Sequence, residues 1–173
     1  MSTFKPMLAA PADLDNIKFP VYASAKLDGI RATVVDGDVL SRSLKLISNH
    51  AIAEALSSSQ WNGLDGELIV GPATDKDVYN KTTRGVNKRI ADEAYRDWMF
   101  YVFDTYTMPA TYKGRYWALV LEQSTWPANF KLLPQKLLKN IDELLKFEEE
   151  MIAEGFEGVI LRDPDGLYKY GRS

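Results

Sequence analysis

The sequence predicts an α+β fold in which mainly antiparallel β-sheets are flanked by helices. Runs rich in β-branched and aromatic residues outnumber helical runs, and consecutive runs of this kind are often separated only by a tight turn. Tight turns join antiparallel strands, whereas parallel strands need long crossover connections. The chain has 173 residues and shows no repeat, low-complexity segment or linker, so we expect one domain over residues 1–173.

The first half of the chain predicts an extended lead-in followed by short strands. The turn Asp36-Gly37-Asp38 lies between two β-branched runs and is a strong hairpin signal. Ser48 or Asn49 can cap a short helix. The expected elements are strands at residues 22–26, 30–35, 39–42 and 64–70, a helix after residue 49, and one or two short surface helices within residues 73–97.

The second half contains the strongest helix signal in the chain. Asn140 is the predicted N-cap, Glu143 completes a capping box, and Gly155 ends the helix. Its apolar stripe is interrupted at Glu148 and comprises Ile141, Leu144, Leu145, Met151 and Ile152. The other expected elements are a buried strand at residues 98–106, a helix at 112–123, a weak strand at 130–133 and a strand at 156–162.

Charge and composition exclude several classes of protein. The 21 basic and 24 acidic residues argue against a surface that binds a polyanion over its whole extent, although a local basic face is compatible with them. His50 is the only histidine and there is no cysteine, which excludes disulfides, thiolate metal sites and histidine-rich zinc sites. No apolar run is long enough to cross a membrane and no secretory signal is present, so we expect a cytoplasmic protein.

Several charged residues stand at the ends of predicted strands. Lys26 ends the first strand and Arg31 begins the second, while Glu67 and Glu157 lie at the beginning of two later strands. Polar residues at neighbouring strand ends can line one shared cleft over a sheet, and a ligand-binding cleft needs a few such polar groups. Taken singly, each has an ordinary interpretation, because lysine is usually exposed and Asp-Gly pairs usually form turns. Their order and residue types are informative only together.

Five short motifs follow one another along the chain. They are KLDGIR at residues 26–31, SR at 41–42, DGE at 65–67, FYVFD at 100–104 and EGVILR at 157–162. In these motifs the chain resembles the ATP-dependent DNA ligases, which belong to the covalent nucleotidyltransferases together with RNA ligases and mRNA capping enzymes. The resemblance implies the ATP-grasp-like nucleotidyltransferase fold of a compact viral or phage ligase, with a role in DNA replication, repair or recombination.

Lys26 is the predicted nucleophile, which attacks the α-phosphate of ATP and holds AMP covalently. An amine attacks phosphorus only when it is unprotonated, and free lysine has a pKa of about 10.4. Partial burial, or a positive charge such as Arg31 or a bound metal ion, is therefore expected to lower the pKa of Lys26. In the complete reaction AMP passes to a 5′-phosphate at a nick, and the 3′-hydroxyl then displaces AMP and seals the strand.

The resemblance also implies residues that bind ATP and Mg²⁺. Carboxylates bind ribose hydroxyls and Mg²⁺, and an arginine binds phosphate. Phe103 offers a ring for stacking on adenine, with Tyr101 on the same strand face as the second choice and a core position for Phe103 as the alternative. The expected nucleotide-binding residues are Ser24, Ala25, Lys26, Leu27, Arg31, Arg42, Glu67, Phe103 and Glu157, and the expected metal ligands are Asp28, Glu67 and Glu157.

The family pattern continues past the EGVILR motif to a strand with a Lys-x-Lys element and then to a separate OB-fold domain. This sequence ends at residues 169–173 (KYGRS), and Lys169 lacks the spacing of that element. The resemblance therefore implies a nucleotidyltransferase core without the final strand and the OB domain, with weakened ATP binding and slow or lost sealing. We expect a monomer that binds nicked double-stranded DNA weakly and no membrane.

Two other functions fit the same residues. An RNA ligase or a GTP-using capping enzyme shares the lysine chemistry and differs in its preference for nucleotide and nucleic acid. A non-catalytic module that binds nucleotide or DNA would keep the fold without turnover. Covalent labelling by ATP or GTP separates the enzymes from the binding module, and the preferred nucleotide separates an ATP-using ligase from a GTP-using capping enzyme.

Overall fold

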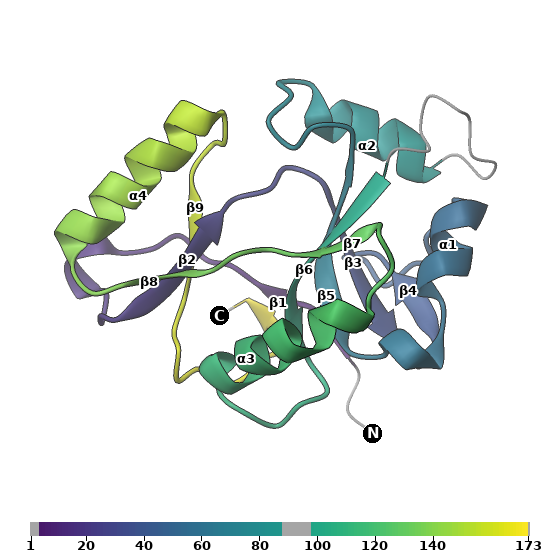
Figure 1. The fold of residues 1–173 in the computed structure, drawn as a ribbon, viewed down its shortest axis with the longest axis horizontal. Coiled ribbons are helices and arrows are strands. Elements are labelled where there is room, and N and C mark those ends of the chain that lie inside the picture. The colour runs from purple at the N-terminus through teal and green to yellow at the C-terminus, as the bar shows by residue number, and fades with distance from the viewer. Residues whose placement is uncertain (1–3, 88–97, 173) are drawn as a thin grey trace.

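A computed structural model describes residues 4–87 and 98–172, which form a five-stranded, a three-stranded and a two-stranded β-sheet, with helices packed against the first two (Figure 1). The strands are β1 Met7–Leu8, β2 Val21–Ala25, β3 Ile30–Val35, β4 Asp38–Leu40, β5 Leu64–Val70, β6 Trp98–Thr105, β7 Phe130–Leu132, β8 Lys136–Leu138, β9 Val159–Arg162 and β10 Gly171–Arg172. The helices are α1 His50–Leu56, α2 Val78–Asn87, α3 Tyr112–Glu122 and α4 Ile141–Glu154, with short 3-10 helices η1 Leu14–Asn16, η2 Ser59–Trp61 and η4 Gln123–Thr125. No helix in this part of the chain has the length and apolar character needed to span a membrane.

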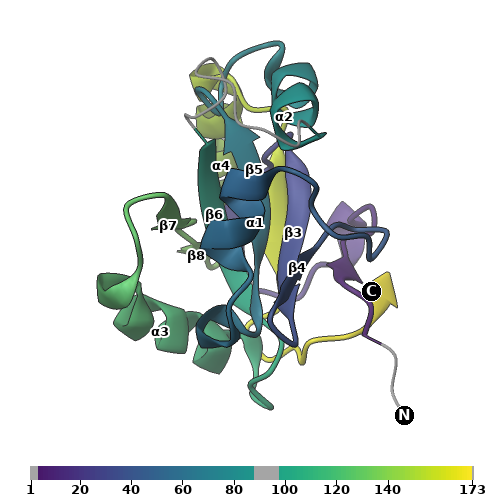
Figure 2. The same ribbon diagram turned by 90° about the vertical axis from the view of Figure 1, so that its right-hand side faces the viewer.

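The larger sheet has the strand order β4-β3-β5-β6-β7 and is antiparallel except for the β6–β7 pair. The predicted hairpin joins β3 to β4, and both Asp36 and Gly37 have positive φ angles, 49° and 84°. A type I′ turn requires this conformation at its two central residues. Side chains of the sheet pack with those of α1, α2 and α3 into one hydrophobic core, which includes Ile52, Val86 and Leu119. Figure 2 shows α1 lying across these strands.

The smaller sheet has the order β8-β2-β9, and both pairs are antiparallel. Val21 and Ala23 of β2 pack with Leu138 of β8 against Leu144 and Phe147 of α4, which forms a second hydrophobic core. In Figure 1 this sheet and α4 occupy the left side of the molecule, away from α1 and α2. The two sheets are therefore each stabilised by a core of their own.

The ends of α4 follow the sequence prediction with one shift. The Asn140 side chain accepts the backbone N–H of Glu143 at 2.9 Å, and Gly155 ends the helix with a φ of 108°. The Glu143 carboxylate accepts the N–H of Lys139 rather than that of Asn140, so the capping box is displaced by one residue. The predicted apolar stripe was correct for Leu144 and Met151 and wrong for Ile141, Leu145 and Ile152, which are exposed. Phe147, which was not predicted, is buried instead.

Other predicted elements agree with the structure in part. The strand predicted at residues 98–106 is present as β6, in which buried residues such as Phe100 alternate with partly exposed ones such as Phe103. β1, β8 and β10 are short strands that the sequence pattern did not predict. One surface helix of the region 73–97 is present as α2, and the rest of that prediction lies at residues 88–97, outside the described residues.

Gly66 of the DGE motif stands inside β5 and not in a turn. A Cβ atom at this position would lie 2.2 Å from the carbonyl oxygen of Tyr101 on β6, at a point where the β5–β6 register shifts. A Cβ at Gly29 would lie 2.1 Å from the carbonyl oxygen of Leu68 on β5. Both glycines therefore permit a close approach of backbone between neighbouring strands, next to the charged residues of their motifs.

Candidate active site

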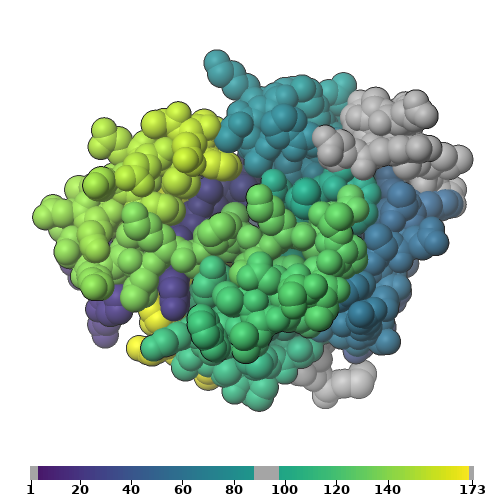
Figure 3. Space-filling view, in the orientation of Figure 1, coloured from purple at the N-terminus to yellow at the C-terminus, as the bar shows by residue number. Residues whose placement is uncertain are grey.

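A cavity of about 350 Å³ lies where the two sheets face each other. Its walls combine β2 and β9 of the smaller sheet with β3, β5 and β6 of the larger one, and the segments around β1 and residues 163–169 form a further side. In the space-filling view, a hollow between α4 and α2 exposes purple residues of the segment that carries β2 (Figure 3). The predicted site residues that line the cavity are Ser24, Ala25, Lys26, Leu27, Arg31, Glu67 and Phe103.

Lys26 directly follows β2 at the cavity wall. Its backbone N–H donates to the carbonyl oxygen of Gly158 at 3.0 Å, which extends the pairing of β2 with β9 by one residue. The sheet therefore fixes the backbone of the lysine, while the residue itself is exposed. Partial burial was one of the two predicted causes of Lys26 activation, and the structure does not provide it. Arg31, the neighbouring positive charge named in the prediction, lines the same cavity.

Arg31 is held rigidly by a buried carboxylate. Its Nε donates to Asp65 Oδ1 at 2.7 Å and its Nη2 donates to Asp65 Oδ2 at 2.6 Å, a bidentate ion pair across the β3–β5 ladder. Thr33 Oγ1 donates to the same carboxylate at 2.9 Å, and Asp65 is fully buried. Burial disfavours the charged guanidinium, but Asp65 outweighs this effect and raises the pKa of Arg31, which stays positive at the cavity wall.

Glu67 lies beside Arg31 in a partly desolvated position. Its Oε2 accepts the backbone N–H of Gly29 at 3.2 Å, so it links β5 to the loop that follows Lys26. Burial raises the pKa of Glu67 to about 7, with smaller contributions from the charges of Asp65 and Asp28, although the Gly29 hydrogen bond and Arg31 act in the opposite direction. In the absence of ligand, this carboxyl group therefore titrates near neutral pH.

We expect Glu67→Gln to remove a pH-dependent part of the folding stability. Because the folded-state pKa lies above the ordinary value of 4.5, the protonated carboxyl stabilises the native state below about pH 4.5, and this contribution is lost as pH rises through 7. Between pH 4.5 and 8, the free energy of unfolding of the glutamine variant should therefore rise by about 2–3 kcal/mol relative to that of the wild type. This follows because each unit of pKa shift corresponds to about 1.4 kcal/mol. Urea unfolding in metal-free buffer measures this, with the exposed Glu150→Gln as control. A constant difference between variant and wild type over this range would contradict the prediction.

Phe103 lies in the cavity wall and not in the core, which excludes the alternative of a buried core residue. The guanidinium carbon of Arg31 is 5.0 Å from the centre of its ring, and that of Arg162 is 4.8 Å from it. Arg162 also donates from Nη1 to the buried Ser24 Oγ at 3.1 Å. Tyr101, the second choice for stacking, is not among the residues that line the cavity.

Three predicted residues, Asp28, Arg42 and Glu157, do not line the cavity. Arg42 is exposed in the loop after β4, and Glu157 is exposed just before β9. The three expected metal ligands do not meet as a group, and nowhere in residues 4–87 and 98–172 do three acidic or histidine side chains form an arrangement that could hold a metal ion. The negative charge of Asp28 contributes to the raised pKa of Glu67, and Mg²⁺ usually takes only one or two carboxylates together with substrate phosphates. This pair therefore fits a metal ion that is shared with a nucleotide.

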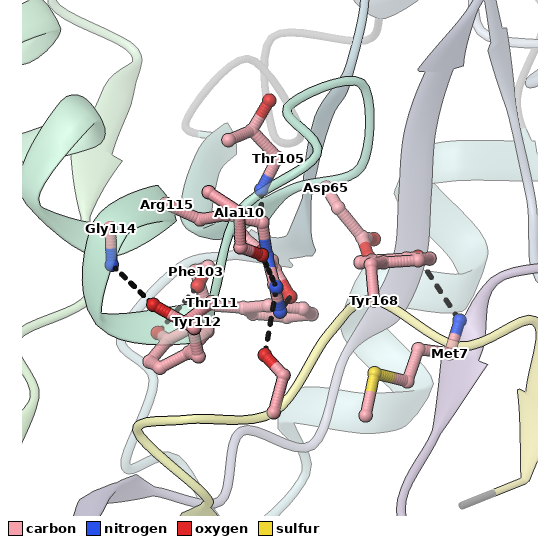
Figure 4. A network of polar contacts seen from close by, with 12 residues as sticks. Met7, Asp65, Phe103, Thr105, Ala110, Thr111, Tyr112, Gly114, Arg115 and Tyr168 are labelled. Atoms are coloured by element: carbon pink, nitrogen blue, oxygen red, sulfur yellow. Dashed lines mark hydrogen bonds and ion pairs between the residues drawn. The ribbon is translucent and has the colours of Figure 1, made fainter.

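Sequence reasoning missed Arg115, which is the largest fully buried side chain among the described residues. It donates from Nε to Asp104 Oδ1 at 2.7 Å and from Nη1 to the carbonyl oxygens of Ala110 at 2.7 Å and Gly166 at 3.0 Å (Figure 4). Arg115, Asp104 and Tyr112 all line the cavity. The Phe-Asp pair in FYVFD was the one signal in the sequence that could have pointed to Arg115. An aspartate that is buried needs a basic partner, so this pair predicts an arginine or lysine nearby.

Comparisons with known proteins agree with the arrangement of these motifs. The sequence model of the ATP-dependent DNA ligase domain matches residues 6–173. Human DNA ligase 4 is 24% identical to this chain, over 97% of the chain and 22% of the human protein. DNA ligase 4 of Pongo abelii matches with the same identity and coverage. The chain therefore spans about a fifth of the length of the curated relatives it matches.

Solved structures of ligases share the fold. The Chlorella virus DNA ligase-adenylate superposes with a TM-score of 0.83 and is 31% identical, over 99% of this chain and 65% of the viral chain. The bacteriophage T7 ATP-dependent DNA ligase, solved in complex with ATP, superposes with a TM-score of 0.70 at 20% identity, over 98% of this chain and 66% of the phage chain. These two likenesses support the fold, and the family relationship rests on the match to the sequence model.

Proposed function

The chain belongs to the family of ATP-dependent DNA ligase domains, and from this premise we propose that it catalyses the adenylation step of a DNA ligase through Lys26. The observation that carries the proposal is the meeting of two sheets at one cavity. The smaller sheet contributes Lys26, and the larger sheet contributes Arg31, Glu67 and Phe103. Transfer of a nucleotidyl group requires a positioned nucleophile, a fixed positive charge stabilises the phosphates, and an aromatic ring can hold the base.

In the proposed reaction the unprotonated Nζ of Lys26 attacks the α-phosphorus of ATP. A phosphorus–nitrogen bond forms, the bond from the α-phosphorus to the pyrophosphate oxygen breaks, pyrophosphate leaves, and the lysine nitrogen releases one proton to the solvent. Arg31, fixed by Asp65, faces the negative charge of the phosphates without having to reorganise. When bound, Mg²⁺ would neutralise further phosphate charge, and Glu67 with Asp28 would hold it.

The later steps are proposed by likeness to the family. AMP passes from Lys26 to the 5′-phosphate of a nick in double-stranded DNA, and the 3′-hydroxyl of the adjoining strand displaces AMP. We further propose that Arg42 contacts DNA or sugar-phosphate from its exposed loop after β4, and that Glu157 approaches the ribose once the nucleotide is seated. We also propose that the protein is a cytoplasmic monomer and that it acts in DNA replication, repair or recombination.

Covalent labelling tests the proposed function. The purified chain is incubated with Mg²⁺ and ATP labelled at the α-phosphate, separated on a denaturing gel, and digested for mass spectrometry. The proposal expects label that resists denaturation and an AMP adduct on the peptide containing Lys26. Preferential labelling by GTP would instead indicate a capping-type enzyme, and the absence of any adduct would favour a non-catalytic binding module. Sealing assays with nicked DNA and nicked RNA distinguish the two kinds of ligase.

A further inference from the structure

We propose that Tyr168 is a positioning residue that connects the segment formed by residues 163–172 and β1 to Arg31 in the cavity. The inference rests on the proposed function, because it assigns a role to Arg31 in nucleotide transfer. Tyr168 does not itself line the cavity, and it acts through Asp65.

Three elements meet at the hydroxyl group of Tyr168. The hydroxyl donates to Asp65 Oδ2 at 2.6 Å, and its oxygen accepts the backbone N–H of Met7 at 3.0 Å. Figure 4 shows the tyrosine between these two partners, with Asp65 on one side and Met7 on the other. The hydroxyl therefore connects β5 to β1, although 103 residues separate Tyr168 from Asp65 and 161 separate it from Met7.

The connection continues from Asp65 to the cavity. The same oxygen, Oδ2, that accepts from Tyr168 also accepts from Arg31 Nη2 at 2.6 Å. The hydrogen bonds thus form a chain from Met7 through Tyr168 and Asp65 to Arg31. Consecutive hydrogen bonds in a buried setting strengthen one another, so the loss of one link weakens the rest. Burial and the charge of Asp65 raise the pKa of Tyr168, so the phenol remains a hydrogen-bond donor.

The segment that Tyr168 anchors is itself part of the cavity wall. Gly166, Leu167 and Lys169 line the cavity together with Met7 and Leu8. β10 pairs with β1 in parallel, and the rings of Phe4, Tyr106, Tyr168 and Tyr170 pack together beside them. Any displacement of this wall is therefore transmitted to the hydrogen bond that Tyr168 donates to Asp65.

Tyr168→Phe removes the hydroxyl and keeps the ring in its aromatic cluster. We expect the rate of AMP transfer to Lys26 at saturating ATP to fall about tenfold, because one hydrogen bond to a buried charge is lost. Tyr170→Phe is the matched control, since it removes a hydroxyl from the same cluster without removing a donor to Asp65, and it should change the rate less than twofold. An unchanged rate in Tyr168→Phe would overturn the proposal.

A double-mutant cycle with Arg31→Lys separates positioning from general destabilisation. If Tyr168 acts through Arg31, Tyr168→Phe should lower the rate less than twofold further in the Arg31→Lys background. A full tenfold loss in both backgrounds would show an effect independent of Arg31 and would overturn the proposal.

A measurement on the protein without nucleotide tests the link between Tyr168 and Arg31 separately from the proposed function. NMR measures the exchange of the Arg31 Nε–H and Met7 N–H protons with water, and Tyr168→Phe should accelerate both by about tenfold. Unchanged exchange of the Arg31 proton would overturn the inference even if labelling of Lys26 succeeds. Absence of labelling in the wild type, by contrast, would refute the proposed function, and the exchange rates would still test the link between Tyr168 and Arg31.

Discussion

Lys26→Ala should abolish covalent attachment of AMP, with a fall in the labelling rate of at least about a thousandfold, because it removes the proposed attacking nitrogen. Lys26 is exposed and its backbone N–H bonds to Gly158, an interaction that alanine retains. The variant should therefore fold normally. The loss should appear in the labelling gel, while the thermal unfolding temperature stays within a few degrees of the wild-type value.

Lys169→Ala is the matched control for this experiment. Lys169 is the other lysine among the described residues that line the cavity, and it is exposed as well. Label should persist on the protein in this variant, with the adduct still mapped to the peptide of Lys26. Label that survives in Lys26→Ala and disappears in Lys169→Ala would reverse the assignment of the nucleophile.

Arg115→Met should destabilise the fold by about 3–5 kcal/mol, because it leaves Asp104 buried without a partner for its charge. Arg115 and Asp104 are 1% and 4% exposed, and two backbone carbonyls would lose their donor as well. Burial raises the pKa of Asp104 even in the wild type, although Arg115 acts in the opposite direction. A raised folded-state pKa stabilises the native state at low pH, so the deficit of the variant should shrink as pH falls.

Two variants serve as controls in the same urea unfolding experiment. Arg84→Met removes an exposed ion pair with Asp77, whose atoms lie 3.5 Å apart, and should cost less than about 0.5 kcal/mol. The double variant Arg115→Met with Asp104→Leu removes the stranded charge and should recover part of the lost stability. A deficit for Arg115→Met as small as that of Arg84→Met would contradict the structural role assigned to the buried pair.

The sequence was informative wherever a local rule determines the structure. The hairpin at Asp36-Gly37, the N-cap at Asn140 and the strand over residues 64–70 follow from turn, capping and β-propensity rules, and all are present. The sequence also predicted that Lys26, Arg31, Glu67 and Phe103 share a cleft, and all four line one cavity, although Glu67 lies in the middle of β5 and not at its beginning. The order of the five motifs along the chain predicted the family to which it belongs.

The remainder depends on contacts that no local rule describes. Tyr168 meets Asp65 across 103 residues, and Arg115 meets Gly166 across 51. The short strand β8 forms because β2 offers it an edge, and its own three residues carry little signal. Arg42 and Glu157 match family motifs, yet they lie outside the cavity lining, so a motif match does not by itself place a residue at the cavity.

The presence of two separate hydrophobic cores has a consequence for cooperativity. Among the described residues, the smaller core contains only Val21, Ala23, Leu138, Leu144 and Phe147, whereas the larger one joins most of the buried apolar side chains. Less buried apolar area means less free energy of local opening, so the smaller unit should open before the larger one. The strand that leads into Lys26 belongs to this less stable unit. A nucleotide that contacts both units would couple their unfolding, because it binds only when the two are folded together.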